Sequence, residues 1–400
     1  MKHIHLLFLA IIVSYSCQTK PTQLGNQKMV VFDNTNLYFD MELKKNPNNH
    51  KDSILRLDAG RVLVKKVNLP SYQMQPSVTI TTTLTSNGDP WDKSGSVFVI
   101  PASASASFLD LENKTVKKEQ FQNEYIGIQQ EKIDSNLVYK PNIELLRFMT
   151  PFGVGFFNNH EKLKDAKPVY IPKWEDNVVW KQDITHLLPL LENEVYIGVY
   201  VDTWNKQGYT VSVELDFTET TIPHHLKKER GVLPVLNTTK YAANQKFYDA
   251  FSKGNLSIAI PVQSTLKNAK LYYIATGHGG YAAGDEFNQK ENIIKLNQKV
   301  IKKFTPWRDD CASFRRFNPS SGVAMIPTTY KGKKIEERIA SSDYSRSNWC
   351  PGSDVKPEII ALGDLAVGTH TFEFAIPKAK AIEDNDINYW MVSAYITYDK

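Results

Sequence analysis

A glycine-rich stretch in the second half of the chain carries the densest set of reactive side chains. Residues 276–287 read T-G-H-G-G-Y-A-A-G-D-E-F and present His278, Asp285 and Glu286 among four glycines. They follow 269–275, an apolar run typical of a β-strand. A strand that ends in such a loop is how all-β scaffolds display acids that can exchange protons with a substrate. The alternative is a long turn whose glycines adopt positive φ and whose acids face solvent.

Two further acids lie close to tryptophans at the ends of expected strands. Asp92 follows Trp91 in the turn S-N-G-D-P-W-D, just before a strand-like run. Asp202 ends the alternating run 194–202, two residues before Trp204. An aspartate at a turn is most often a capping residue, which leaves a purely structural role open for Asp92.

Strand patterns dominate the chain and must position these loops. β-branched, often alternating runs bounded by Pro, Gly and Asn recur over 29–217 and again over 232–398, without helical periodicity of comparable length. The polar, basic stretch 218–231 is the best linker. We therefore predict an all-β protein of two antiparallel jelly-roll β-sandwich domains, at 29–222 and 223–400.

Composition narrows the possible partners. The 400 residues include 42% hydrophobic and 23% charged residues, as is ordinary for a globular protein, and the formal net charge of +5 is spread along the chain. Without a concentrated basic stripe, nucleic acid is not an expected partner. The 19 Tyr, 19 Phe and 7 Trp favour β-structure and a surface able to stack on sugars.

The N-terminus predicts export. The apolar run 6–13 is too short to span a bilayer, and a small residue precedes Cys17. The arrangement resembles a bacterial lipobox, so we expect 1–17 to be a lipoprotein signal, Cys17 to be lipidated, and 18–28 to be a tether. The membrane contact would be this lipid anchor alone. An ordinary secretory signal that discards Cys17 is the alternative.

The two remaining cysteines are Cys311 and Cys350. In an exported protein such a pair usually forms a disulfide, and closing a loop of this length stabilises a fold by roughly 3–4 kcal/mol. Two separate buried thiols are the alternative.

Short motifs in both halves fall in the order known from one family. They are W-D at 91–92, R-F-M-T-P-F-G-V-G at 147–155, D-I-T at 183–185, V-D-T-W at 201–204, V-L-P-V-L-N at 232–237, G-H-G with D-E-F at 277–287, and N-W-C-P-G at 348–352. Over roughly 30–400, the chain resembles the peptide-N-glycosidase F family of bacterial N-glycan amidases.

The resemblance implies two jelly rolls packed side by side, with a site in the groove between them. Members of the family hydrolyse the amide that joins an asparagine side chain to the first N-acetylglucosamine of an N-linked glycan. The asparagine becomes aspartate and a glycosylamine leaves, without metal or other cofactor. The expected substrates are N-linked glycoproteins or glycopeptides, and we expect a monomer.

The resemblance also implies roles for three acids. Asp92 matches the essential aspartate of the W-D motif and is expected to activate or orient water. Glu286 matches the glutamate of the second-domain loop and is expected to hold the substrate amide or first sugar and to donate a proton. Asp202 stands where the best-known members have glutamate before T-W, so its carboxylate is one methylene shorter. Carboxylates can act as base and acid when their environments separate their pKa values.

Five further residues are expected to bind substrate. Trp204 and Trp349 would form aromatic walls, and Arg346 would contact the oxyanion or a sugar hydroxyl. Trp91 and His278 would complete the lining. The disulfide Cys311–Cys350 matches a family bridge and would hold the second-domain loops, whereas other family cysteines are missing, and Lys93 replaces the arginine that follows W-D.

Two other interpretations stay open. A non-catalytic glycan-binding lipoprotein could use the same fold, although a pure binder has no need of three converging carboxylates. A copper monooxygenase would need histidines at set spacings, but the His224-His225 pair lies in the expected linker. The single H-x-H motif, His3 to His5, lies in the expected signal. His278 and His370 are therefore not expected to bind metal. A G-x-S-x-G nucleophile elbow is also absent from the sequence.

Overall fold

The computed structural model describes most of the chain, namely residues 25–45, 53–121, 131–132, 137–154, 171, 173–223, 226, 229–241, 245, 247, 249–279, 284–383 and 387–400. The expected signal with Cys17, most of the tether, His224-His225 and residues 280–283 of the glycine-rich loop lie outside these ranges. Within them, no helix has the length and apolarity needed to cross a bilayer.

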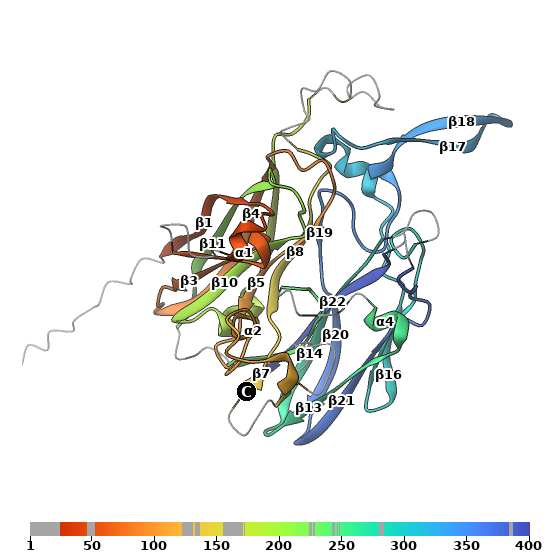
Figure 1. Cartoon of the computed structure of the whole chain (residues 1–400). Coiled ribbons are helices and arrows are strands. Elements are labelled where there is room, and N and C mark those ends of the chain that lie inside the picture. Colours follow the sequence, from red (N-terminus) through yellow and green to blue (C-terminus); the bar gives the residue numbers. More distant parts are fainter. Residues whose placement is uncertain are drawn as a thin grey trace, which may run out of the picture.

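The first sandwich stacks two antiparallel sheets (Figure 1). One sheet consists, in spatial order, of β1 (Asn26–Leu37), β11 (Tyr209–Pro223), β4 (Met74–Ser86) and β9 (Val178–Asp183). The facing sheet consists of β8 (Ile143–Met149), β5 (Ser94–Ile100), β10 (Glu194–Val201), β3 (Val62–Asn68) and β2 (Ile54–Leu57). In β4, Val78, Ile80 and Leu84 are buried in the core and their neighbours are less buried, because successive side chains point to opposite faces.

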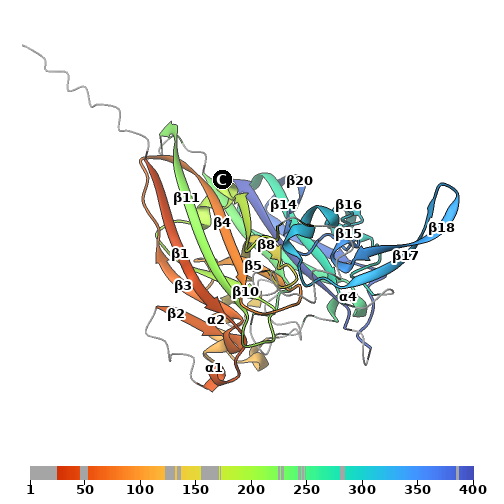
Figure 2. The ribbon, with the colours of Figure 1, turned by 90° about the horizontal axis from the view of Figure 1, so that it is seen from above.

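The second sandwich is built in the same way and lies beside the first (Figure 2). One sheet consists of β12 (Arg230–Asn237), β22 (Tyr389–Asp399), β14 (Leu266–His278) and β20 (Glu358–Leu365). The other consists of β13 (Leu256–Val262), β21 (Gly368–Ala375), β15 (Asn292–Leu296) and β16 (Lys299–Phe304). A separate apolar core fills the space between these sheets.

Short elements connect the strands. The helical turns are α1 (Glu42–Lys45), η1 (Asp58–Gly60), α2 (Phe108–Glu112), η2 (Lys118–Gln120), η3 (Thr185–Leu190), α4 (Ala250–Lys253), η5 (Cys311–Phe317) and η6 (Ser341–Asp343). Two strand pairs lie outside the sandwiches: β6 (Glu131–Lys132) with β7 (Val138–Tyr139), and β17 (Val323–Tyr330) with β18 (Lys333–Ala340). The β17–β18 ribbon projects from the body of the molecule in Figure 1.

The two sandwiches are joined by backbone and by buried charge. The strand β19 (Asp354–Val355) belongs to the second half of the chain but pairs with β8 of the first sandwich. Glu144 and Arg147, whose side chains are fully buried, form an ion pair at 2.5 Å. Arg147 also donates hydrogen bonds to Thr276 Oγ1 (3.2 Å) and to the Met391 carbonyl (2.7 Å) on the second sandwich. These contacts fix the orientation of the two domains.

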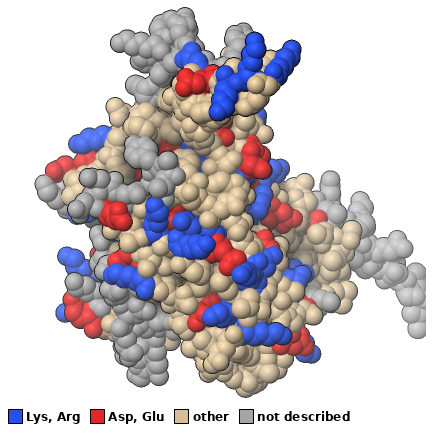
Figure 3. Space-filling model, turned by 90° about the vertical axis from the view of Figure 1, so that its right-hand side faces the viewer, with Lys and Arg blue, Asp and Glu red and all other residues tan. Residues whose placement is uncertain are grey.

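The predicted architecture of two jelly-roll sandwiches is confirmed. The boundary at 222–223 stays a prediction; β11 ends at Pro223 and β12 begins at Arg230. The strands β16 and β18 have a weak sequence signal, because K-V-I-K-K-F and K-K-I-E-E-R-I-A lack a continuous apolar face. On the face shown in Figure 3, basic and acidic side chains are mixed.

Candidate active site

A pocket of about 460 Å³ brings the expected site residues of the two domains together. Asp92 and Asp202 contribute from the first domain, and Glu286 contributes from the second. Trp204, Trp349 and His278 also line this pocket. The three acids that the sequence singled out therefore share one cavity.

The turn before β5 leaves Asp92 available for a contact across the domain interface. Asp89, not Asp92, caps this turn: its Oδ1 accepts a hydrogen bond from the Trp91 amide (3.1 Å), and its Oδ2 accepts one from the Thr203 hydroxyl (2.7 Å). Asp92 Oδ2 instead lies 3.3 Å from Arg346 Nη1, which belongs to the second domain. The capping function considered for Asp92 thus belongs to its neighbour.

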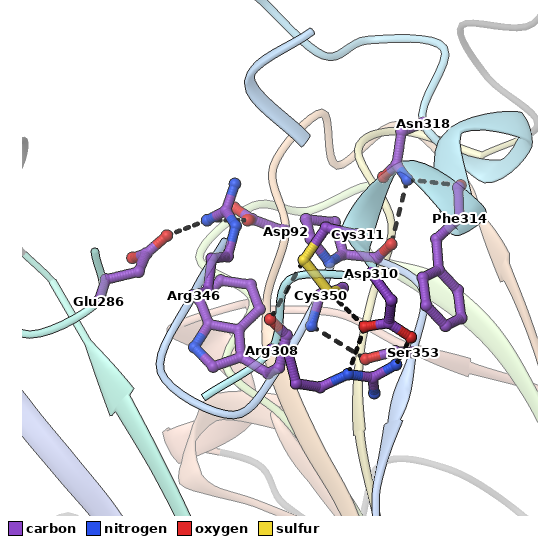
Figure 4. Close-up of a disulfide and its surroundings, with 12 residues drawn as sticks. Asp92, Glu286, Arg308, Asp310, Cys311, Phe314, Asn318, Arg346, Cys350 and Ser353 are labelled. Atoms are coloured by element: carbon purple, nitrogen blue, oxygen red, sulfur yellow. Dashed lines mark hydrogen bonds and ion pairs between the residues drawn. A yellow bond between two sulfur atoms is a disulfide. The ribbon is translucent and has the colours of Figure 1, made fainter. Parts of the chain in front are cut away.

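Arg346 joins the two domains at the pocket (Figure 4). Its Nη1 forms an ion pair with Glu286 Oε1 as well as with Asp92. Its Nη2 donates a hydrogen bond to the Ser341 carbonyl at 3.0 Å, and its guanidinium lies 4.6 Å from the centre of the Trp349 ring. With a residue exposure of only 2%, Arg346 is held on all these sides.

Covalent and backbone links hold Arg346 in place. The disulfide Cys311–Cys350 closes four residues after it, as the sequence predicted. The backbone of Arg346 exchanges two hydrogen bonds of 2.9 Å with Arg308, whose side chain pairs with Asp310 next to the disulfide. The segment that carries Arg346 and Trp349 is therefore rigid.

Burial and the shared guanidinium act in opposite directions on the pKa values of two carboxyls. Burial raises the pKa of Glu286 to about 7, with Arg346 opposing the rise and the Asp92 charge adding to it. Burial also raises the pKa of Asp92, with Arg346 and then Lys93 opposing. One guanidinium carries one positive charge, so the two carboxyls retain a proton between them near neutral pH.

Asp202 has a different arginine. Its Oδ1 lies 3.0 Å from Arg61 Nη1, and Arg61 also pairs with the buried Asp58. Burial raises the pKa of Asp202, and Arg61 is the largest influence that lowers it. Trp204, two residues further along, is 54% exposed and has the Arg61 guanidinium 4.1 Å from its ring centre.

His278 is a neutral wall of the pocket. Its ring stacks with those of Trp349 and Tyr389, at centroid distances of 5.4 and 4.9 Å, and its Nε2 lies 2.7 Å from Thr276 Oγ1. Burial, assisted by the charges of Arg147 and Arg346, lowers its pKa to about 3. Among the described residues, no group of three or more His, Cys, Asp or Glu could hold a metal ion.

The remaining expected binding residues differ in exposure. Trp349 lines the pocket but is only 3% exposed, and its Nε1 donates a hydrogen bond to the Gly277 carbonyl (2.8 Å). Trp91 is 61% exposed and lies outside the pocket lining. Arg346 is buried by its carboxylate partners. The substrate-binding roles of these three residues stay predictions.

Sequence reasoning missed Arg61, Lys240 and Tyr389. Lys240 and Tyr389 line the pocket, and Arg61 lies behind it against Asp202. Tyr389 begins the last strand, a position that could have marked it, because strand ends carry site loops. The sequence around Lys240 contains no motif that would mark it as a site residue.

Comparisons with known proteins place the chain in a family. The family models described as Peptide-N-glycosidase F, N terminal, and Peptide-N-glycosidase F, C terminal, match residues 28–217 and 246–397. No curated protein matches the chain by sequence.

Solved structures give the same result. Two structures of PNGF-II are 35% and 34% identical to the chain, each with a TM-score of 0.77, and the matches cover 93% and 94% of this chain. This chain spans 65% of the length of PNGF-II. PNGase F from Flavobacterium meningosepticum, described as a glycosylasparaginase, is 17% identical with a TM-score of 0.56, and the match covers 94% of this chain and 96% of that one. That likeness supports the fold alone. With both family models matched along the chain, the protein belongs to the peptide-N-glycosidase F family.

Proposed function

We propose that the protein is an N-glycan amidase that hydrolyses the amide between an asparagine side chain and the first N-acetylglucosamine. The observation that carries the proposal is the ion-paired trio of Asp92, Arg346 and Glu286 at the interdomain pocket. It gives the pocket two carboxyls with raised pKa values, one to accept a proton and one to donate it.

Asp92 is the general base of the proposed reaction. In its ionised form it takes a proton from a water molecule, and the hydroxide oxygen adds to the carbonyl carbon of the asparagine side chain. The positive charges of Arg346 and the pocket-lining Lys93 favour the oxyanion that forms.

Glu286 is the general acid. With a pKa of about 7 it holds a proton in a large fraction of the molecules at neutral pH, and it can transfer that proton to the glycosyl nitrogen as the C–N bond breaks. The products are aspartic acid on the peptide and a glycosylamine. The proton that Asp92 gained replaces the one that Glu286 lost, so the pair ends with the same single proton.

Asp202 and Trp204 bind the sugar in this proposal. A carboxylate can accept hydrogen bonds from sugar hydroxyls, and the half-exposed indole offers an apolar surface to a pyranose ring. His278 and Tyr389 extend the aromatic lining.

The test is incubation of a denatured N-glycoprotein with the protein, followed by mass spectrometry of the peptide and the glycan. We expect the glycosylated asparagine to become aspartate and an intact glycan to appear, and the Asp92→Ala variant to yield neither. A glycopeptide left unchanged by the wild-type protein would contradict the amidase and favour a glycan-binding protein. Equal conversion by Asp92→Ala would contradict the assigned base.

A further inference from the structure

A buried arginine lies directly behind the sugar-binding side of the pocket. Arg61 is 4% exposed and extends between two carboxylates, with Nη1 at 3.0 Å from Asp202 Oδ1 and Nη2 on Asp58 Oδ2. Asp58, itself 4% exposed, does not line the pocket, whereas Asp202 does. Arg61 therefore connects a pocket carboxylate to an anchor in the domain interior.

The same guanidinium supports Trp204. It lies 4.1 Å from the centre of the Trp204 ring and 5.7 Å from that of Phe39, and the two rings are 5.3 Å apart. A cation over an indole face is an attractive contact, and burial strengthens it. Arg61 thus contacts both residues that the proposed function assigns to the sugar.

The backbone that carries Arg61 adopts an unfavourable conformation. Asp58, Ala59 and Gly60 have φ values of 47°, 57° and 94°, so three consecutive residues lie at positive φ. At the first two, which carry side chains, such a conformation persists only where surrounding contacts hold it, and it occurs often at functional sites. At Gly60 a side chain would collide with the Tyr38 carbonyl.

Backbone hydrogen bonds tie this turn to the pocket. The Val201 amide donates to the Arg61 carbonyl (3.1 Å), and the Asp202 amide donates to the Ser94 carbonyl (3.0 Å). The turn, the end of β10 and the start of β5 therefore form one connected unit beneath Asp202.

We propose that Arg61 is a positioning residue that holds the Asp202 carboxyl and the Trp204 indole in place as a single sugar-binding wall. The inference rests on the proposed function, because it takes these two residues as the sugar contact. The groups that act on the pKa of Asp202 include Arg61, Lys93, Asp58 and the hydroxyl of Tyr200. Lys240, Asp92, Glu286 and His278 line the same pocket. Of the groups that act on this pKa, Arg61 contributes most to keeping the carboxyl ionised against burial.

The experiment measures the Kd of the disaccharide from the reducing end of an N-glycan by calorimetry, over a range of pH. The variants are Arg61→Met, which keeps the aliphatic stem, and Arg61→Lys, which keeps the charge. Asp202→Asn provides a reference without the titrating carboxyl. Arg56→Met is the matched control, because Arg56 is a 7% exposed arginine on the adjacent β2 that does not line the pocket.

We expect Arg61→Met to weaken binding about tenfold or more, since a charged hydrogen bond and a stacked cation are lost. In the wild-type protein, binding weakens as pH falls through the pKa of Asp202. Without Arg61 that pKa rises, so the weakening begins at higher pH, by about one unit or more. Arg61→Lys should restore the wild-type pH dependence in part, and Arg56→Met should bind as the wild-type protein does.

An unchanged Kd and pH dependence in Arg61→Met would overturn the proposal. An equal loss of disaccharide affinity in Arg61→Lys and Arg61→Met, accompanied by an equally lowered Tm, would also overturn it. That pattern would indicate a purely structural residue. If Arg61→Met does not fold, Arg61→Lys decides the question: it lacks the planar guanidinium, so binding equal to wild type would overturn the proposal. Binding needs no turnover, so a failure of the amidase assay alone is distinguishable from a failure here.

Discussion

Two arginine-centred groups face the same pocket and differ in where their acids lie. In the Arg346 unit (Asp92, Glu286 and Arg346), both acids line the pocket and they come from different domains. In the Arg61 unit (Asp58, Arg61, Asp202 and Trp204), all residues come from the first domain, and Asp58 is buried behind the pocket wall.

This difference separates proton transfer from sugar binding. Two pocket carboxyls on one guanidinium retain a proton, and the pKa of Glu286 rises to about 7. In the Arg61 unit a single carboxyl meets the pocket, and its arginine is fixed from behind by Asp58. The interdomain unit is therefore suited to acid–base chemistry, and the single-domain unit is suited to holding a ligand.

The largest effect is expected from the base of the Arg346 unit. Asp92→Asn should lower kcat by about 10²- to 10⁴-fold, because water activation is lost, while the Kd of the disaccharide changes little. Asp216→Asn, an aspartate on β11 outside the pocket, is the control for the same chemical change. The kcat is measured from the rate of glycan release from a glycopeptide. A similar kcat in Asp92→Asn and Asp216→Asn would contradict the role assigned to Asp92.

Removal of the shared cation should destabilise the protein strongly. Arg346→Met leaves two buried carboxyls without their partner, which costs about 3–5 kcal/mol of unfolding free energy, measured by urea denaturation. Adding Asp92→Asn to this variant should restore part of the stability, because the ionised member of the pair is then neutral. Strictly additive losses would show that the pair does not share the cation.

The disulfide should stabilise the fold and affect the two units unequally. Replacement of both Cys311 and Cys350 by serine opens a loop with a sequence separation of 39 and should cost about 3–4 kcal/mol of unfolding free energy. The segment that holds Arg346 is next to this bridge, so kcat should fall while disaccharide binding at Trp204 is retained. Binding that falls in parallel with kcat would contradict the separation of the two units.

The smallest of these effects is expected from Trp204, in the Arg61 unit. Trp204→Ala should raise KM about tenfold with little change in kcat, because apolar contact with the sugar is lost but the Arg346 unit is intact. Tyr330→Ala, at an exposed aromatic residue of β17 outside the pocket lining, is the control. A fall in kcat without a change in KM would place Trp204 in the proton-transfer machinery instead.

Much of the fold could be predicted from the sequence because its strands alternate on buried faces, as Val78, Ile80 and Leu84 show. The loop acids could be found because they follow strand ends. The pairing of Asp92 with Arg346 could not, because it depends on how two separately folded sheets dock. Arg61 was missed because nothing in L-D-A-G-R-V indicates positive φ at Asp58 and Ala59.

The central claim is that Asp92 and Glu286, which both pair with the Arg346 guanidinium, hold one proton between them. The pH dependence of kcat/KM tests this claim most directly. The wild-type protein should lose activity as pH rises through an apparent pKa near 7, because Glu286 then loses the proton it must donate. Activity should also fall at low pH as Asp92 is protonated. In Glu286→Gln the residual activity should no longer show the alkaline decline. An alkaline decline that persists unchanged in this variant would contradict the account.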